Sequence, residues 1–196
     1  MAFDPPASSA VLATSVRTTV LLSSLRGLRA RSLFTPYMGK LAPRSHEAIL
    51  SISAAQWLPI QVACDHYSAC DALDLPRSSM LAIGEESGLL LNQTALGVIL
   101  KLSTSATGVT PWPAIAQSRS LIARTWQGTS IAAFKLGPKE ARIEWVAQPC
   151  ATSEYFRIAF GGFLNGLLSL FCRKSFVRES PAQCSATAVA YRCSWV

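Results

Sequence analysis

The chain has 196 residues, of which 50% are hydrophobic and 15% are charged, and its formal net charge is +7. This composition predicts one globular domain with a sizeable core and excludes a disordered, a collagenous or a coiled-coil chain. The longest uncharged run of the C-terminal half, residues 158–172, is shorter than the roughly 20 residues of a membrane-spanning helix. Residues 1–16 contain Asp4 and no base, so we expect no secretory signal and a cytoplasmic protein.

The N-terminal part of the chain carries mainly helical patterns. Residues 1–10 are rich in Pro, Ser and Ala, which predicts a flexible start. From residue 15 a β-branched stretch passes into leucines at helical spacing, which predicts a short strand that runs into a helix. Gly84 and Gly88 interrupt the stretch that follows Pro76. Further helices are predicted, in chain order, over residues 45–55, 59–70, 89–102 and 110–127.

After Gly128 the hydrophobic period changes from helical spacing to two. A hairpin is predicted with its turn at 137–140, then an apolar helix over 153–172, then a second hairpin that ends the chain. Hairpin, helix and hairpin together predict a four-stranded antiparallel sheet with the helix across one face. The expected fold class is α+β. A single domain over 11–196 has a helical part, 11–127, packed on a sheet part, 128–196.

The apolar helix over 153–172 holds the candidate ligand site. Gly161, Gly162 and Gly166 lie inside it, each at a cost of roughly 1 kcal/mol against Ala. Such glycines indicate either close approach of the helix to the sheet or a cavity beside it, and we favour close packing on the sheet while leaving a cavity open. The candidate pocket residues are Phe156, Phe160, Phe163, Gly166 and Leu167.

The residues that most often carry chemistry form no recognised motif. The six cysteines lack zinc-ligand spacing, since the two closest pairs are Cys64 with Cys70 and Cys184 with Cys193, so we interpret them as structural thiols. His46 and His66 lie outside any nucleophile motif, and we interpret them as surface or partly buried polar residues. We therefore expect no catalytic residues, no metal and no enzymatic activity.

The order of these elements resembles the heme nitric oxide/oxygen-binding (H-NOX) fold and its heme-free relatives. The resemblance is nearest to an uncharacterised family present in many copies in myxobacteria, which are bacteria. It covers most of the chain after Ala10. The segments that carry it are 15–20 with 25–28, Trp57-Leu58-Pro59, 66–73, 108–112, 136–141, 155–166 and 191–195.

The resemblance implies a heme site that this chain does not complete. In H-NOX proteins a histidine in the helix before the C-terminal sheet binds the heme iron, and a Tyr-x-Ser-x-Arg motif holds the propionates. The corresponding helix here, 111–127, has no histidine, and Tyr-x-Ser-x-Arg does not occur in the sequence. We therefore expect no heme and no other cofactor.

Two classes of function remain. The leading hypothesis is a non-enzymatic, regulatory or sensor-like signalling module that binds a small apolar ligand, a protein partner or a second copy of itself. The alternative is a basic nucleic-acid-associated protein, which rests on the net charge of +7 and on Arg17, Arg26, Arg29 and Arg31. Because the bases occur singly and without interleaved aromatic residues, we expect no nucleic-acid partner.

Overall fold

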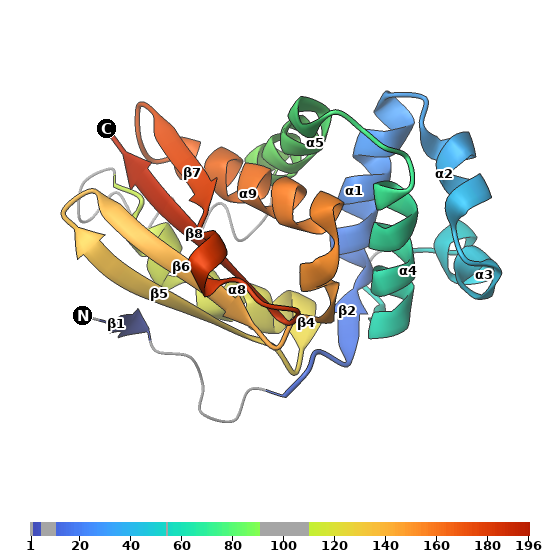
Figure 1. Cartoon of the computed structure of the whole chain (residues 1–196), viewed down its shortest axis with the longest axis horizontal. Coiled ribbons are helices and arrows are strands. Elements are labelled where there is room, and N and C mark those ends of the chain that lie inside the picture. Colours follow the sequence, from blue (N-terminus) through green and yellow to red (C-terminus); the bar gives the residue numbers. More distant parts are fainter. Residues whose placement is uncertain (1, 5–10, 54, 91–109) are drawn as a thin grey trace.

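A computed structural model describes residues 2–4, 11–53, 55–90 and 110–196 as an α+β structure, as predicted (Figure 1). Helices α1 to α4 lie at one end and the large sheet lies at the other, with α9 running between them. No helix within the described ranges is long and apolar enough to cross a bilayer. The helices are α1 (Thr18–Ala30), α2 (Phe34–Lys40), α3 (His46–Leu50), α4 (Ile60–Asp71), α5 (Arg77–Leu90), α7 (Trp112–Ala116), α8 (Ser118–Thr125) and α9 (Glu154–Ser169). The strands are β1 (Ala2–Asp4), β2 (Ser15–Arg17), β3 (Trp57–Pro59), β4 (Trp126–Gln127), β5 (Ser130–Gly137), β6 (Glu140–Val146), β7 (Ser175–Glu179) and β8 (Ala188–Trp195).

The predicted antiparallel sheet is present in the order β1-β5-β6-β8-β7. Alternate residues of β6, namely Ala141, Ile143 and Trp145, are buried, which is the period of two seen in the sequence. The helix α9 packs on this face, where Phe160 contacts Trp145 and Tyr191. The four predicted strands are present as two hairpins, β5 with β6 and β7 with β8.

A fifth strand differs from the flexible start expected for residues 1–10. Residues Ala2–Asp4 form β1 and pair with the free edge of β5. An edge strand offers unpaired N–H and C=O groups to any extended backbone, whatever its side chains, so composition could not predict this pairing. Residues 5–10 lie outside the described residues.

A small sheet, in the order β3-β2-β4, joins three distant parts of the chain. Ser15 pairs with Pro59 on one side and with Gln127 on the other. Strand β2 leads into α1, β3 leads into α4, and β4 follows α8. This sheet therefore fixes the ends of three helices at one place in the molecule.

Several predicted helices have different bounds in the structure. The predicted helix over 45–55 is only α3. The one over 110–127 is broken at Gln117 into α7 and α8, and it ends before Trp126, where the backbone is extended and pairs with β2 as β4. Helix α5 continues through Gly84 and Gly88 instead of being interrupted there. Most of the predicted helix over 89–102 lies outside the described residues.

Glycines let α5 and α9 pack backbone against backbone. A Cβ atom added at Gly84 would lie 1.9 Å from the carbonyl oxygen of Ala159, and one added at Gly162 would lie 2.2 Å from that of Leu81. Gly88 and Gly166 are equally restricted, at 2.4 Å from backbone oxygens of the facing helix. No side chain fits there. The glycines of the apolar helix do permit close packing, but at Gly162 and Gly166 the partner is α5 and not the sheet that we expected; only Gly161 faces the sheet, at Tyr191.

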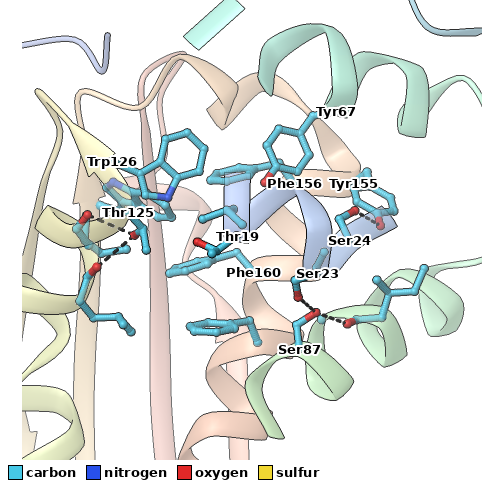
Figure 2. Close-up of a pocket in the computed structure, with 18 residues that line it drawn as sticks. Thr19, Ser23, Ser24, Tyr67, Ser87, Thr125, Trp126, Tyr155, Phe156 and Phe160 are labelled. Atoms are coloured by element: carbon cyan, nitrogen blue, oxygen red, sulfur yellow. Dashed lines mark hydrogen bonds between the residues drawn. The ribbon is translucent and has the colours of Figure 1, made fainter. Parts of the chain in front are cut away.

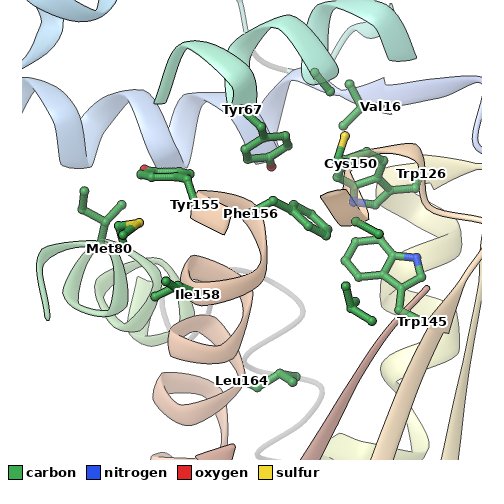
Figure 3. Packing of buried hydrophobic residues seen from close by; sticks show 14 of the residues in the cluster. Val16, Tyr67, Met80, Trp126, Trp145, Cys150, Tyr155, Phe156, Ile158 and Leu164 are labelled. Atoms are coloured by element: carbon green, nitrogen blue, oxygen red, sulfur yellow. The ribbon is translucent and has the colours of Figure 1, made fainter. Parts of the chain in front are cut away.

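The N-terminus of α9 is fixed by its own sequence. The Ser153 side chain accepts a hydrogen bond from the backbone N–H of Phe156 at 3.1 Å, and Glu154 places a negative charge in the first turn. Pro149 begins the 3-10 turn that precedes this cap. The helix therefore begins directly before Tyr155 and Phe156, the first aromatic residues of its buried face. Figure 3 shows the buried cluster in which Phe156 of α9 lies between Tyr67 of α4 and the tryptophans Trp126 and Trp145.

Candidate functional site

A cavity of about 200 Å³ lies beside α9, where the helical part meets the sheet (Figure 2). Its walls come from α1, α4, α5, α8, β4, β6 and α9, so the small sheet that fixes α1, α4 and α8 also shapes the cavity. The described residues that line it are Thr19, Val20, Ser23, Ser24, Tyr67, Ile83, Gly84, Ser87, Leu121, Ile122, Thr125, Trp126, Trp145, Tyr155, Phe156, Ala159, Phe160 and Phe163.

Aromatic rings form much of this wall. Seven of the lining residues are aromatic, and the phenylalanines at Phe156, Phe160 and Phe163 follow one another along α9. Their rings are nearly parallel, at 8° between Phe156 and Phe160 and 15° between Phe160 and Phe163. Rings in fixed orientation cannot collapse into an adjoining space as flexible aliphatic chains can, which helps to keep the cavity open.

Hydroxyl groups supply the polar part of the wall. Ser23 of α1 donates to Ser87 of α5 at 2.5 Å, and Ser87 donates to the carbonyl of Ile83 at 2.9 Å. On α8, Thr125 donates to the carbonyl of Leu121 at 3.0 Å. None of the described lining residues carries a charge at neutral pH.

Behind the wall lies a buried chain of hydrogen bonds. The Tyr37 hydroxyl is 2.8 Å from His66 Nδ1, His66 Nε2 is 3.0 Å from the Ser24 hydroxyl, and Ser24 is 2.9 Å from the Tyr155 hydroxyl. Burial lowers the pKa of His66 to about 3, so its imidazole is neutral. A neutral imidazole donates from one nitrogen and accepts at the other, which suits a hydroxyl on each side. Ser24 and Tyr155 connect this chain to the cavity, which they both line.

The contact of Ser24 with His66 resembles a nucleophile and base, but its surroundings do not suit catalysis. Desolvation by burial lowers the imidazole pKa so far that it is a weak base near neutral pH. Ser24 lies within α1, where backbone N–H groups bond within the helix and are not free to stabilise an oxyanion. Both properties fit a structural network. The sequence predicted a surface or partly buried position for His66, whereas the structure buries it fully because α4 packs between α1, α2 and α9.

The residue beside His66 has a different role. Asp65 accepts hydrogen bonds from the Arg44 guanidinium at 2.6 and 2.8 Å, from Ser45 at 2.7 Å and from Gln61 at 2.9 Å. The Arg44 bond and the two neutral donors outweigh desolvation and lower the pKa of Asp65 to about 2. This group ties the segment before α3 to α4 and takes no part in the cavity.

The structure places three of the five candidate pocket residues in the cavity wall. Phe156, Phe160 and Phe163 line it, whereas Gly166 and Leu167 do not. Gly166 faces α5, where the backbone of Glu85 fills the space of a side chain. Leu167 turns to a separate small cluster with Ala114 and Phe171. They were misplaced because the helical period identifies a buried face without saying what that face meets.

The sequence did not predict most of the residues that line the cavity. The lining residues of α1, α5 and α8 are small hydroxyl and aliphatic side chains, and nothing in their spacing distinguishes a cavity wall from an ordinary core. The Gly84 and Gly88 pair in α5, with the same four-residue spacing as Gly162 and Gly166, was a usable signal for the close contact that positions that helix.

The cysteines do not form a metal site. All six are free thiols, and Cys64 and Cys150 are nearest to each other, with 3.7 Å between their sulfur atoms. No group of three or more His, Cys, Asp or Glu side chains within the described ranges could hold a metal ion.

Comparison with known proteins identifies the architecture. No protein-family model matches the chain, and no curated protein matches it. The Fe(II) unliganded H-NOX protein from K. algicida matches over 92% of this chain and 96% of its own, with a TM-score of 0.62 at 10% sequence identity. The chain has an H-NOX-like fold.

Two further structures agree. A Cs H-NOX variant with 4-cyano-L-phenylalanine covers 91% of this chain and 96% of its own, with a TM-score of 0.56 at 10% identity. A protein whose heme redox potential is modulated by porphyrin distortion covers 91% and 99%, with a TM-score of 0.56 at 9% identity. The H-NOX resemblance inferred from the sequence is confirmed for the fold, and at such identities for the fold alone.

The residues around the cavity do not fit a heme. The described lining residues include no His, Cys or Met, and burial holds the pKa of Tyr67 and of Tyr155 above the ordinary value, so neither phenol ionises readily to bind iron. The same set has no Lys or Arg to pair with propionates. Residues 91–109, which the structure does not describe, have no His, Cys, Met or Tyr in their sequence.

Proposed function

We propose that this chain is a heme-free, non-enzymatic sensor-like module that binds a small apolar molecule in the cavity beside α9. The observation that carries the proposal is a space of about 200 Å³ with an aromatic wall and no charged residue among its described lining residues. A cavity of about 150 Å³ with apolar walls is large enough for benzene. The volume therefore suits a ligand of one or two rings, far smaller than a porphyrin.

The H-NOX-like fold supports a sensing role. One of the matching structures, at 10% identity and a TM-score of 0.53, concerns the mechanism of H-NOX activation. In this chain the cavity is lined by the helices and by β6 of the sheet, so a bound molecule would contact the helical part and the sheet part at the same time. A protein partner or a second copy would then respond to occupancy. A cytoplasmic location and a myxobacterial origin stay predictions.

The nucleic-acid alternative gains no support from the basic residues near the N-terminus. Arg31 pairs with Glu86 at 2.6 Å, and Arg17 donates to the carbonyl of Ala55 at 2.8 Å. The Arg29 guanidinium lies over the Phe34 ring. These three arginines contact their own protein surface, which offers no clustered basic face for a nucleic acid.

Calorimetric titration with p-xylene, an apolar probe without hydrogen-bonding groups, tests the proposal. We expect binding to the wild-type protein and no binding after Leu121→Trp, because the indole would occupy the space next to α8. The matched control is Ala123→Trp on the same helix, since Ala123 is exposed and does not line the cavity. Absence of binding to the wild type, or equal binding to both variants, would refute the proposal.

Two further measurements test the heme-free and non-enzymatic parts. After hemin is added to the purified protein and the unbound excess is removed by gel filtration, we expect no Soret absorption. A fluorophosphonate probe, which labels activated serines covalently, should leave Ser24 unlabelled. A stoichiometric heme complex would contradict the first expectation, and labelling lost in Ser24→Ala would contradict the second.

A further inference from the structure

The buried side chain of Tyr67 lines the cavity, and its hydroxyl has no hydrogen-bond partner among the described residues. The side chain is 5% exposed and lines the cavity from α4. Its ring makes edge-on contacts with His66 and with Phe156, with 5.0 Å between ring centroids in both cases. Figures 2 and 3 show the hydroxyl directed toward Phe156, where the cavity begins. Among the described residues, no hydrogen bond to this hydroxyl is formed.

Buried polar groups are nearly always hydrogen-bonded within the protein. The Tyr67 hydroxyl is not among the fully buried atoms without a partner, so it keeps accessible surface that an occupant of the cavity can reach. Tyr155, the other tyrosine of the wall, bonds to Ser24, and Tyr191 donates to the carbonyl of Arg157 at 2.8 Å. Tyr37 bonds to His66. Tyr67 alone among the chain's four tyrosines lacks such a bond within the described part of the structure.

The Tyr67 hydroxyl can both donate and accept. Burial raises the pKa of Tyr67 well above its ordinary value, so the phenol stays protonated at neutral pH. Phenylalanine would pack equally well in a purely apolar wall, whereas a phenol is suited to a molecule that brings a hydrogen-bonding group.

The remaining wall restricts the charge and shape of that molecule. An ionised ligand would lose its hydration without gaining a countercharge, because the described lining residues have none. The nearly parallel rings of Phe156, Phe160 and Phe163 favour a flat occupant that packs against them. Ser23 adds a second polar contact, because its hydrogen is donated to Ser87 while its oxygen can still accept.

We propose that the cavity selects neutral aromatic molecules of one or two rings that carry one uncharged hydrogen-bonding group, and that Tyr67 is the residue that recognises this group. The inference rests on the proposed function, since it specifies the ligand class of the same cavity. Phenols are the simplest members of the class.

The test compares p-cresol with p-xylene, which differ by a hydroxyl in place of a methyl group, on wild type and on Tyr67→Phe. The ratio of the two dissociation constants cancels the difference in hydration of the probes when it is compared between proteins. We expect the preference for p-cresol to fall about tenfold in Tyr67→Phe, the size of a buried hydrogen bond. The matched control is Tyr191→Phe, which removes a hydroxyl bonded outside the cavity and should leave the ratio unchanged.

The outcomes separate the two proposals. If both probes bind and the ratio is the same in Tyr67→Phe as in wild type, the recognition by Tyr67 is wrong while the apolar site stands. If neither probe binds to wild type, both proposals fail. Should Tyr67→Phe not fold, ¹³C NMR of wild type with ζ-labelled tyrosine replaces it: p-cresol should shift the Tyr67 signal more than p-xylene does and leave Tyr191 in place. Equal shifts of Tyr67 by the two probes would overturn the inference.

Discussion

Two faces of α9 pack against their neighbours in opposite ways, one by close backbone contact and the other around a cavity. On the face toward α5, glycines bring backbone against backbone, so that a single Cβ at Gly162 would lie 2.2 Å from a carbonyl oxygen. On the neighbouring face, phenylalanines hold α1 and α8 away and leave about 200 Å³. Burial alone therefore does not show how closely a helix face is packed. The smallest residues make the tight face, toward α5, and the largest residues make the open face, toward the cavity.

The largest loss of stability should follow from adding a side chain to the tight face of α9. Gly162→Ala forces α5 and α9 apart, because the obstacle is backbone that cannot change rotamer. We expect a loss of about 3 kcal/mol or more in the free energy of unfolding, at the upper end of overpacking costs. Urea denaturation measures it.

Gly39→Ala is the control for that experiment. Gly39 lies in α2 with no atom within 4 Å of an added Cβ. The substitution should stabilise the protein by up to about 1 kcal/mol through helix propensity. If Gly162→Ala were tolerated as well as Gly39→Ala, the backbones of α5 and α9 would not be in close contact at Gly162.

The open face depends on the buried chain behind it, and acid should weaken that chain. Because burial lowers the pKa of His66 to about 3, the unfolded chain, with a histidine pKa near 6.5, binds more protons between these values. Stability is therefore lost as the pH falls from 6.5 toward 3, by about 1.4 kcal/mol per pH unit from this group.

The variant His66→Gln separates this effect from other acid titrations. Its slope of stability against pH should be smaller than that of wild type between pH 6 and about 4. The loss from Asp65 comes in a lower window, because its pKa is lowered from 3.8 to about 2. Equal slopes in wild type and in His66→Gln would show that His66 is not held neutral by burial.

Ser153→Ala should weaken α9 without distinguishing its faces. The cap hydrogen bond to Phe156 is lost, at a cost of about 1 kcal/mol. Phe156 of the first turn lines the cavity, but its ring is also held by Tyr67, Trp126 and Trp145, so probe binding per folded molecule should not change. A change in p-xylene affinity larger than the change expected from stability would show that the cap positions the cavity wall.

The smallest effect on stability is expected from Ala159→Leu, which adds carbons on the open face. Ala159 lines the cavity, so the larger side chain has space, and we expect a change within about 1 kcal/mol in thermal unfolding. The affinity for p-xylene should fall because the same space is taken. A destabilisation as large as that of Gly162→Ala would contradict the presence of an open cavity.

The sequence predicted the alternating strands and the apolar helix well, because periodic burial is written directly in the order of residues. It predicted three wall residues of the cavity for the same reason: Phe156, Phe160 and Phe163 share one face of α9. It could not predict Tyr67, whose free hydroxyl depends on the absence of a neighbour. Nor could it predict that Gly166 faces α5 while Phe163 faces the cavity, since both lie on buried sides of one helix.

The most direct test of an open, ligand-accepting face is a p-xylene titration followed by methyl NMR of the isoleucines. Ile83 and Ile122 line the cavity from α5 and α8, whereas Ile49 is buried in α3, apart from it. We expect saturable shifts of the methyl signals of Ile83 and Ile122, with the Ile49 signal unchanged. Signals of Ile83 and Ile122 that do not move, or that move no more than that of Ile49, would contradict it.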